Sequence, residues 1–379
     1  MASEGRLASF ATTLCTTICW LAVHGFCQVH GCSPEIPGRK RSGQKLGSYY
    51  GCNSTENFLN TSQLDWLTGP LTTIFLPTIY STVLFTGLPA NALAIWVLAV
   101  KIKKVPSTLF LLNLATADMF FVLVLPFKIS YHFLGNNWLF GEALCRMTTA
   151  FFYVNIHCSI LFLTCISVDR YFSLVHPFKA RGSRGWRKSV LICIAVWILV
   201  VAALIPFLLV PQTVTFKSPD ITTCHDITAV CYKNDWLLYY MLGLVVFGFA
   251  IPFLVVVFCY GAIILNLTPK SRNHSRVIWL VFLVFFTFLL CFIPSNVLYF
   301  SYSITNLQER SNQLYRWYTV ALALGSFNSS IDPFIYYFTS RDFREVVKTT
   351  VCIANGKNSL ILGRTSEQLL QKKATVSSG

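Results

Sequence analysis

Long apolar stretches alternate with short polar or basic segments along most of the chain. Seven of these stretches are of the length that crosses a bilayer, and they cover about residues 72–100, 108–133, 142–175, 188–209, 237–266, 274–303 and 313–338. About 20 apolar residues in helical conformation span the hydrocarbon core of a membrane. The pattern therefore predicts an all-α membrane protein whose residues 72–338 form a seven-transmembrane helix bundle.

The segments outside the bundle differ in pattern. Residues 1–27 hold one Arg, the apolar run from Leu7 to Val23 and then Gly25, which is typical of a secretory signal peptide; a weak extra helix is the alternative. Residues 28–71 are expected to be an extracellular tail that carries glycosylation acceptors at Asn53 and Asn60. After the bundle, the amphipathic residues 341–348 predict a short eighth helix within a cytoplasmic segment, 339–379.

Composition supports a membrane location, and the charge distribution gives the orientation. Hydrophobic residues make up 54% of the chain and charged residues 12%, too few charges for an ordinary soluble domain. The net charge of +15 does not indicate a nucleic-acid partner, because the basic residues collect in alternate loops. The expected location is the plasma membrane, with the N-terminus extracellular and the C-terminus cytoplasmic. The basic loops contain Lys101, Lys103, Lys104, Lys179, Arg181, Arg184, Arg187, Lys188, Lys270, Arg272, Arg276, Arg341, Arg344 and Lys348.

Polar and proline residues recur inside the apolar stretches, where polar groups are costly and are usually kept for function or for helix pairing. They fall in the order and register of the rhodopsin-like receptors, and this resemblance covers about residues 70–351. The residues that carry it are Asn91, Asp118, Asp169-Arg170-Tyr171, Trp197, Pro252, Tyr260, Pro294 and Asp332-Pro333-Phe334-Ile335-Tyr336.

The resemblance implies a heterotrimeric G protein as partner. Arg170, beside Asp169, would become a donor for an incoming G protein once it is unpaired; the alternative is an ordinary surface ion pair. No acid stands near His274, so no ionic latch from Arg170 is expected. The residues expected to couple to the G protein are Asp169, Arg170, Tyr171, Tyr260 and Tyr336.

A polar pocket inside the bundle is a second implication. Asp118, Ser159, Asn328 and Asp332 match positions that line such a pocket in the family, often around a sodium ion. Two neighbouring carboxylates repel unless a cation or a proton neutralises one of them. A bound sodium ion and a protonated acid both remain open, and no other cofactor is expected. The family more often has Asn where this chain has Asp332.

Packing and cysteine residues add further expectations from the same resemblance. Ile160, Pro252 and Phe288 correspond to a packing switch, although ordinary bundle packing explains them equally well. Pro294 would kink its helix, and Phe292 stands where the family commonly has Trp. Cys145 and Cys224 match the family's disulfide bridge, and Cys352 is a candidate for palmitoylation and hence for contact with membrane lipid.

A narrower resemblance points to the protease-activated receptors. It implies that an extracellular serine protease cuts the N-terminal tail and that the new terminus folds back as a tethered agonist. His225 and Asp226 would contact that agonist, Asp226 through its charge. The segments that carry this resemblance are Gly135-Asn136-Asn137-Trp138, Phe140-Gly141-Glu142, Ile221-Thr222-Thr223-Cys224-His225-Asp226, Phe292-Ile293-Pro294-Ser295-Asn296 and Ser326-Phe327-Asn328-Ser329-Ser330-Ile331-Asp332-Pro333-Phe334.

The tail offers a matching cleavage site. A trypsin-like protease needs a basic residue before the bond it cuts, and Arg41 supplies one; cleavage after Arg39 or Lys45 is an alternative, as is a merely solvated or processed basic cluster. The family members that thrombin cuts carry an acidic patch after the cleavage site, which engages a basic surface of that protease. This chain has only Glu56 and Asp65 there, so the resemblance implies a trypsin-like activator rather than thrombin. The tethered agonist would be Ser42-Gly43-Gln44-Lys45-Leu46-Gly47, about 30 residues from the first helix.

Several alternatives remain open at this stage. Cys52 is expected to pair with Cys32 or with Cys231. A rhodopsin-like receptor for a diffusible peptide, lipid or nucleotide is the main competing function. A transporter is disfavoured because internal repeats are not found in the sequence, and an enzyme because no His and carboxylate pair or metal-ligand spacing lies within the helices.

Overall fold

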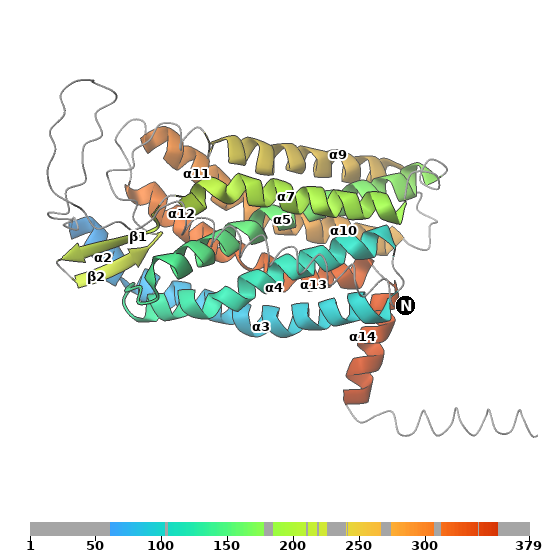
Figure 1. Ribbon diagram of the computed structural model, residues 1–379. Coiled ribbons are helices and arrows are strands. Elements are labelled where there is room, and N and C mark those ends of the chain that lie inside the picture. The colour runs from blue at the N-terminus through green and yellow to red at the C-terminus, as the bar shows by residue number, and fades with distance from the viewer. Residues whose placement is uncertain are drawn as a thin grey trace, which may run out of the picture. The chain divides into compact units, whose positions relative to one another are not determined.

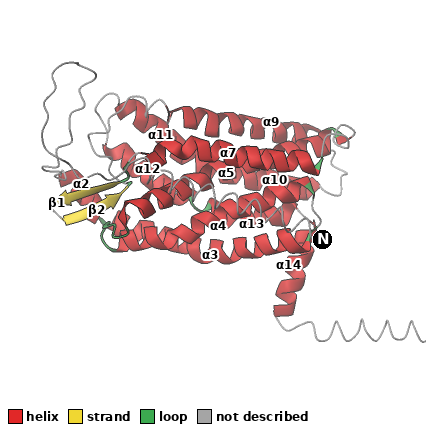
Figure 2. Ribbon diagram, viewed as in Figure 1, coloured by secondary structure: helices red, strands yellow, loops and turns green. Residues whose placement is uncertain are grey.

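The computed structural model describes residues 61–102, 105–177, 185–209, 211–217, 220–225, 240, 242–266, 274–306, 312–339 and 341–354. The chain divides into two units, Met1–Gly51 and Cys52–Gly379, and every described residue belongs to the second. That unit is a bundle of long helices with a two-stranded hairpin at one end (Figures 1 and 2). The all-α fold expected from the sequence is confirmed.

Six predicted membrane crossings are present as helices that are long and apolar enough to span a bilayer. Their bounds agree with the predicted stretches to within a few residues, except that the described part of the fifth begins at Leu242 rather than at residue 237. The crossings are η1 (Leu71–Phe75) with α3 (Leu76–Trp96) and η2 (Val97–Lys101), α4 (Pro106–Phe133), α5 (Gly141–Val175), α7 (Trp186–Leu209), η4 (Val246–Ala250) with α9 (Ile251–Asn266), and α10 (His274–Thr287) with η5 (Phe288–Phe292) and α11 (Ile293–Asn306).

The seventh crossing is made of two shorter helices, α12 (Asn312–Gly325) and α13 (Asn328–Thr339). They meet at a turn formed by Ser326 and Phe327. The Ser326 N–H donates to the Leu322 carbonyl at 3.1 Å, and the Ser330 N–H donates to the Phe327 carbonyl at 2.9 Å. Neither half is long enough to cross a bilayer alone, but the two together cover the predicted stretch.

Three π-helical segments each end two residues before a proline. η1 precedes Pro77, η4 precedes Pro252 and η5 precedes Pro294. Proline has no N–H to donate, and its ring clashes with the carbonyl four residues earlier, so the preceding turn widens. The kink predicted at Pro294 would therefore fall next to η5, the π-helical turn that contains Phe288 and Phe292.

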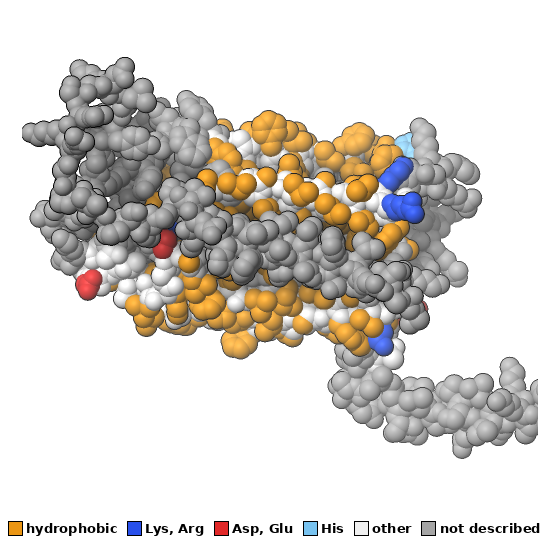
Figure 3. Space-filling view, in the orientation of Figure 1, with side chains coloured by type: hydrophobic (Ala, Val, Ile, Leu, Met, Phe, Trp, Pro, Cys, Tyr) orange, Lys and Arg blue, Asp and Glu red, His pale blue; other side chains and the backbone are white. Residues whose placement is uncertain are grey.

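The helices bury one large hydrophobic core and three smaller clusters, and they expose apolar side chains outward. α4 packs against α3 and α5, α5 against α7 and α9, and α13 against α3 and α10. Leu254 and Phe258 of α9 are each 64% exposed, as expected for side chains that face lipid rather than water. Figure 3 shows this apolar belt, with Lys and Arg side chains at one end of the visible face.

Four short elements complete the described unit. Strands β1 (Thr213–Lys217) and β2 (Asp220–Cys224) pair antiparallel, with Thr213 opposite Cys224. α2 (Thr61–Thr68) lies within the segment expected to be tail. α14 (Arg341–Ala354) is the predicted eighth helix and extends beyond residue 348; its buried Phe343 contacts the Tyr336 ring at a centroid distance of 6.2 Å.

Candidate functional site

The hairpin end of the bundle, where β1 and β2 lie, is covalently joined to α5. Cys145 in the first turns of α5 forms a disulfide with Cys224 at the end of β2, with a Cα to Cα distance of 5.8 Å. Both cysteines are fully buried, and Tyr131 and Trp138 pack against them. The predicted bridge is therefore present, and it holds β2 over the bundle.

Glu142 fastens the other strand to the same helix. Its carboxylate accepts hydrogen bonds from the Gln212 N–H and the Thr213 N–H, each at 2.8 Å, and from the Thr213 hydroxyl. It also pairs with Arg146, whose guanidinium donates to the Leu208 carbonyl at 2.8 Å. Because the start of β1 and the end of α7 bind the same ion pair, the hairpin has a defined position.

His225 follows the disulfide and joins three elements. Its Nε2 lies 3.0 Å from the Tyr153 hydroxyl on α5, its Nδ1 lies 2.6 Å from the Gln212 side-chain oxygen, and its carbonyl accepts a hydrogen bond from Tyr315 on α12. Its backbone has φ +66°, a conformation that is uncommon for a residue other than glycine. His225, expected to contact an agonist, thus lies at the centre of this end.

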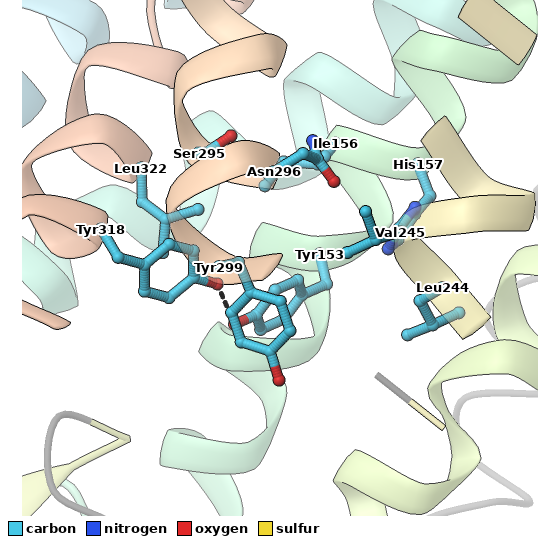
Figure 4. A pocket seen from close by; sticks show the side chains of 10 residues that line it. All are labelled: Tyr153, Ile156, His157, Leu244, Val245, Ser295, Asn296, Tyr299, Tyr318 and Leu322. Carbon is cyan, nitrogen blue, oxygen red and sulfur yellow. Dashed lines mark hydrogen bonds between the residues drawn. The ribbon is translucent and has the colours of Figure 1, made fainter. Parts of the chain in front are cut away.

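Two small cavities open below the hairpin, and His225 lines one of them. The first, of about 50 Å³, lies between α5, the residues before η4, and α11 and α12; Figure 4 shows Tyr153 and Tyr318 meeting there, with their hydroxyls 3.2 Å apart. The second, of about 30 Å³, shares both tyrosines. It is lined by Tyr80, Lys128, His132, Thr149, Phe152, Tyr153, His225, Tyr315, Tyr318, Thr319 and Leu322.

The polar pocket expected from the sequence is assembled in the middle of the bundle. Asp118 accepts hydrogen bonds from Asn155 at 2.7 Å, Ser329 at 2.8 Å and Tyr336 at 3.4 Å. Asn328 donates to the Ser159 hydroxyl at 3.0 Å. Sequence reasoning named Asp118, Ser159 and Asn328 but missed Asn155 and Ser329, which are also buried.

Asp332 lies in the same pocket and is fully buried. It interacts electrostatically with Asp118, and neither of its carboxylate oxygens accepts a hydrogen bond from any residue that the structure describes. Buried acceptors without a donor are costly. Hard cations take oxygen ligands, so the oxygen-rich surroundings of Asp118 and Asp332 fit a sodium ion, and they equally fit a shared proton.

The opposite, α14 end holds the predicted coupling residues. Asp169 is buried, and the charge of Arg170 acts on the buried Tyr260 hydroxyl of α9. The Tyr171 hydroxyl lies 3.0 Å from Nε2 of His176, and its ring contacts Phe258. Tyr336 does not join this group through its hydroxyl, which donates to Asp118 in the polar pocket.

The predicted packing switch lies between the two ends. Ile160 and Phe288 are fully buried in one core together with Phe292, and Pro252 is buried beside them. The Phe288 ring contacts Phe253 at 5.4 Å and Phe292 at 5.3 Å. Tyr336 of the polar pocket is buried in the same core, and Tyr153 and Ile156, which line the first cavity, pack against it.

Comparison with known proteins places this arrangement in a family. Residues 90–336 match the model of the 7 transmembrane receptor (rhodopsin family). The chain is 42% identical to proteinase-activated receptor 3 of Bos taurus over 284 residues, which cover 75% of each chain, and 42% identical to that of Homo sapiens over 75% of this chain and 76% of the relative. It is 36% identical to proteinase-activated receptor 2 of Mus musculus over 82% of this chain and 80% of the relative.

The chain belongs to the proteinase-activated receptors, within the rhodopsin family. Both resemblances stated from the sequence are confirmed. Receptors 1 and 4 are also among its relatives, at 38% identity for the Xenopus laevis and Rattus norvegicus proteins. Since receptors 1, 2, 3 and 4 all lie between 36% and 42%, identity alone does not assign a subtype.

Several site residues expected of a proteinase-activated receptor lie outside the described residues. They are Arg41, Ser42-Gly43-Gln44-Lys45-Leu46-Gly47, Asn53, Asn60, Asp226 and the cysteines Cys32, Cys52 and Cys231. Cys352 lies in α14, but its side chain is not described. The expectations about these residues stay predictions.

The residues that sequence reasoning missed are mostly tyrosines and backbone-binding polar groups. Tyr153, Tyr315 and Tyr318 carry the hydrogen bonds around His225, and Gln212 carries its other contact. A sequence signal was available in part, because tyrosines are unusual in lipid-facing apolar stretches except near the membrane interface. Nothing in the sequence ties Gln212 to His225, since that contact depends on the hairpin register.

Proposed function

We propose that this chain is a plasma-membrane receptor which a trypsin-like serine protease activates by cutting its N-terminal segment after Arg41. The observation that carries the proposal is the identity of 36–42%, over three quarters or more of the chain, to receptors whose name states activation by a proteinase. The new terminus, Ser42 to Gly47, then acts as a tethered agonist.

The hairpin end faces outward in this proposal. A disulfide persists on the oxidising side of a membrane, which supports an extracellular position for Cys145 and Cys224 and for α2, which packs against Ile221 of the same hairpin. Lys101, Arg187, Lys188 and Arg344 lie at the other end, as the positive-inside rule requires of the cytoplasmic side. The C-terminal segment is then cytoplasmic.

The agonist binds over the cavities beneath the hairpin. Tyr153, Tyr315, Tyr318 and His225 supply hydroxyl and imidazole groups, which suit the small polar residues Ser42 and Gln44. The cationic α-amine or Lys45 pairs with Asp226. Contact at His225 reaches α5 and α12 together, because its ring binds Tyr153 and its carbonyl binds Tyr315.

A heterotrimeric G protein binds at the α14 end and takes the signal from Arg170. Asp118 and Asp332, with Ser159 and Asn328, would hold a sodium ion inside the bundle; the ion supplies positive charge that neutralises the two carboxylates. α14 lies along the membrane surface, where a palmitoyl group on Cys352 contacts lipid, and Asn53 and Asn60 carry glycans outside.

The test compares three basic residues in cells that express the receptor on their surface. Arg41→Ala is expected to abolish the calcium response to trypsin, while the matched variants Arg39→Ala and Lys40→Ala, which lie outside the proposed agonist, still respond. N-terminal sequencing of the treated receptor should begin at Ser42. A free peptide Ser-Gly-Gln-Lys-Leu-Gly should activate the uncut receptor, and an Arg41→Ala receptor that still responds to trypsin would move the cut elsewhere.

A further inference from the structure

α2 (Thr61–Thr68) is held against the bundle by apolar and cationic contacts. Trp66 and Leu67 are buried in a cluster with Val320 of α12, and Ile221 of β2 packs against the same cluster. The Arg316 guanidinium lies over the Trp66 ring, 5.6 Å from its centroid. The helix thus touches β2 of the hairpin and α12, which contributes residues to both cavities.

The C-terminal carbonyls of α2 are also bound, although helix ends usually leave such groups without a partner. The Asn136 amide donates to the Leu67 carbonyl, and the Thr72 hydroxyl lies 2.8 Å from the Trp66 carbonyl and 3.1 Å from that of Leu67. Asn136 has φ +62°, which Asn tolerates better than most residues. Its side chain is fixed in turn by Nδ1 of His132 at 2.7 Å.

These contacts connect α2 to the agonist cavity through a short chain of hydrogen bonds. His132 lines the second cavity, bonds to Asn136, and Asn136 bonds to the end of α2. The side chain of His132 is 2% exposed, so this chain runs through the interior rather than across the surface. The polypeptide is therefore held beside the cavity at α2, before the first membrane helix begins.

We infer that α2 is an anchor that fixes the base of the tethered agonist beside its cavity, an inference that rests on the proposed function. Between Gly47 and Thr61 there are 13 residues, 48–60, whereas without the anchor the free leash would include residues 48–70, which number 23. A leash of 13 residues spans up to about 45 Å when extended, so reach is sufficient. Shortening the leash from 23 to 13 residues raises the effective concentration of the agonist at the cavity about two- to threefold, because this concentration falls with the −3/2 power of leash length.

Two variants release α2 from opposite sides of its contact, and a third is the matched control. Trp66→Ala removes the buried ring from α2 itself. Thr72→Val removes the hydroxyl that binds the Trp66 and Leu67 carbonyls, keeps nearly the same side-chain volume and touches no residue that lines the cavities in the contacts described. Asp65→Asn changes the exposed face of the same helix and should behave as the wild type.

Each receptor is tested with saturating trypsin and, separately, with the free peptide Ser-Gly-Gln-Lys-Leu-Gly, and G protein activation is normalised to surface receptor. Both measurements, with trypsin and with free peptide, are repeated with Leu46→Ala in the receptor and in the peptide. This change is expected to lower the affinity of the agonist, so that the tethered agonist no longer saturates the cavity. In receptors that carry Leu46→Ala, both releasing variants should lose about two- to threefold in the trypsin response per cut receptor. Their half-maximal peptide concentration should be unchanged.

The two arms separate the anchor from its alternatives. Equal losses toward trypsin and free peptide would overturn the anchor, because they would mean that α2 only supports the binding cavity. No loss in either arm would overturn it as well. A wild-type receptor that responds to neither trypsin nor peptide would instead overturn the proposed function, a result that the variants cannot imitate.

Discussion

At the residue scale, His225 shows how a strained position can serve communication. A residue other than glycine at φ +66° costs of order 1 kcal/mol and persists only when its surroundings hold it. Here Tyr153, Gln212 and Tyr315 hold it, and each belongs to a different part of the hairpin end. A ligand that displaces one contact therefore weakens the restraint on all of them.

The buried carboxylates lead to a prediction about sodium. Asp118 has three hydrogen-bond donors, whereas Asp332 has none among the residues described, so a cation between them should stabilise the agonist-free receptor. We expect the melting temperature of the purified receptor to rise when sodium chloride replaces choline chloride at equal ionic strength. Asp332→Asn should remove this rise, because one charge of the pair is lost.

A proton shared by the two acids gives a different result in the same measurement. In that case sodium leaves the melting temperature unchanged, while Asp332→Asn should leave the receptor about as stable as before, since the amide N–H can replace the hydrogen bond that the shared proton makes to Asp118. Asp220→Asn, which removes an exposed acid at the start of β2, is the control for losing a negative charge.

At the element scale, the long apolar stretches predicted the crossings well, because each crossing must place about 20 apolar residues in the protein core or against lipid. It could not predict the break between α12 and α13, because Ser326 and Phe327 look like ordinary helix residues and the turn depends on packing with neighbouring helices. Residues 61–68 are predicted as part of the extracellular tail, and the sequence does not signal α2, because eight residues with little apolar character do not form a stable helix alone. Its stability comes from Val320 and Asn136, which are distant in sequence.

The site could be predicted where residues match the motifs of the rhodopsin-like receptors. Asp118, Asp332, Arg170 and Cys145 were all expected from this resemblance. Glu142 and Gln212 could not be assigned a role, because each acts through the backbone of β1 or through its register with β2. Register depends on the turn and on long-range contacts that one sequence does not display.

Gly325 gives a prediction about how closely two crossings approach. A Cβ at this position would lie 2.7 Å from the Cys291 carbonyl oxygen in η5, closer than atoms pack. Gly325→Ala should force α12 away from η5 and destabilise the receptor by about 1–3 kcal/mol, seen as a lower melting temperature. Gly261→Ala in α9 meets nothing within 4 Å and should be neutral or slightly stabilising. Equal melting temperatures would contradict the close contact.

At the scale of the whole molecule, the two ends are linked by groups that already touch. Phe288 packs with Phe253 and Phe292 in the central core, and Tyr336 connects the Asp118 pocket to Phe343 of α14. Phe288 and Phe292 lie in the π-helical turn before Pro294, and another such turn precedes Pro252. A change at the cavities can therefore reach the α14 end through packed side chains rather than through loops.

Arg170 is where this arrangement meets its partner, and its replacement should separate folding from signalling. The guanidinium lies at the α14 end near Tyr260, outside the polar pocket and the disulfide-linked hairpin on which the fold depends. Arg170→Ala should therefore keep surface expression and binding of the free agonist peptide, yet lose at least about tenfold in G protein activation, the loss expected when one charged hydrogen bond of 1.5–3 kcal/mol is removed. Lys101→Ala, which removes an exposed charge at the same end, should signal normally. If Arg170→Ala signals at full strength while Lys101→Ala does not, the G protein contact lies on the loop after η2 instead.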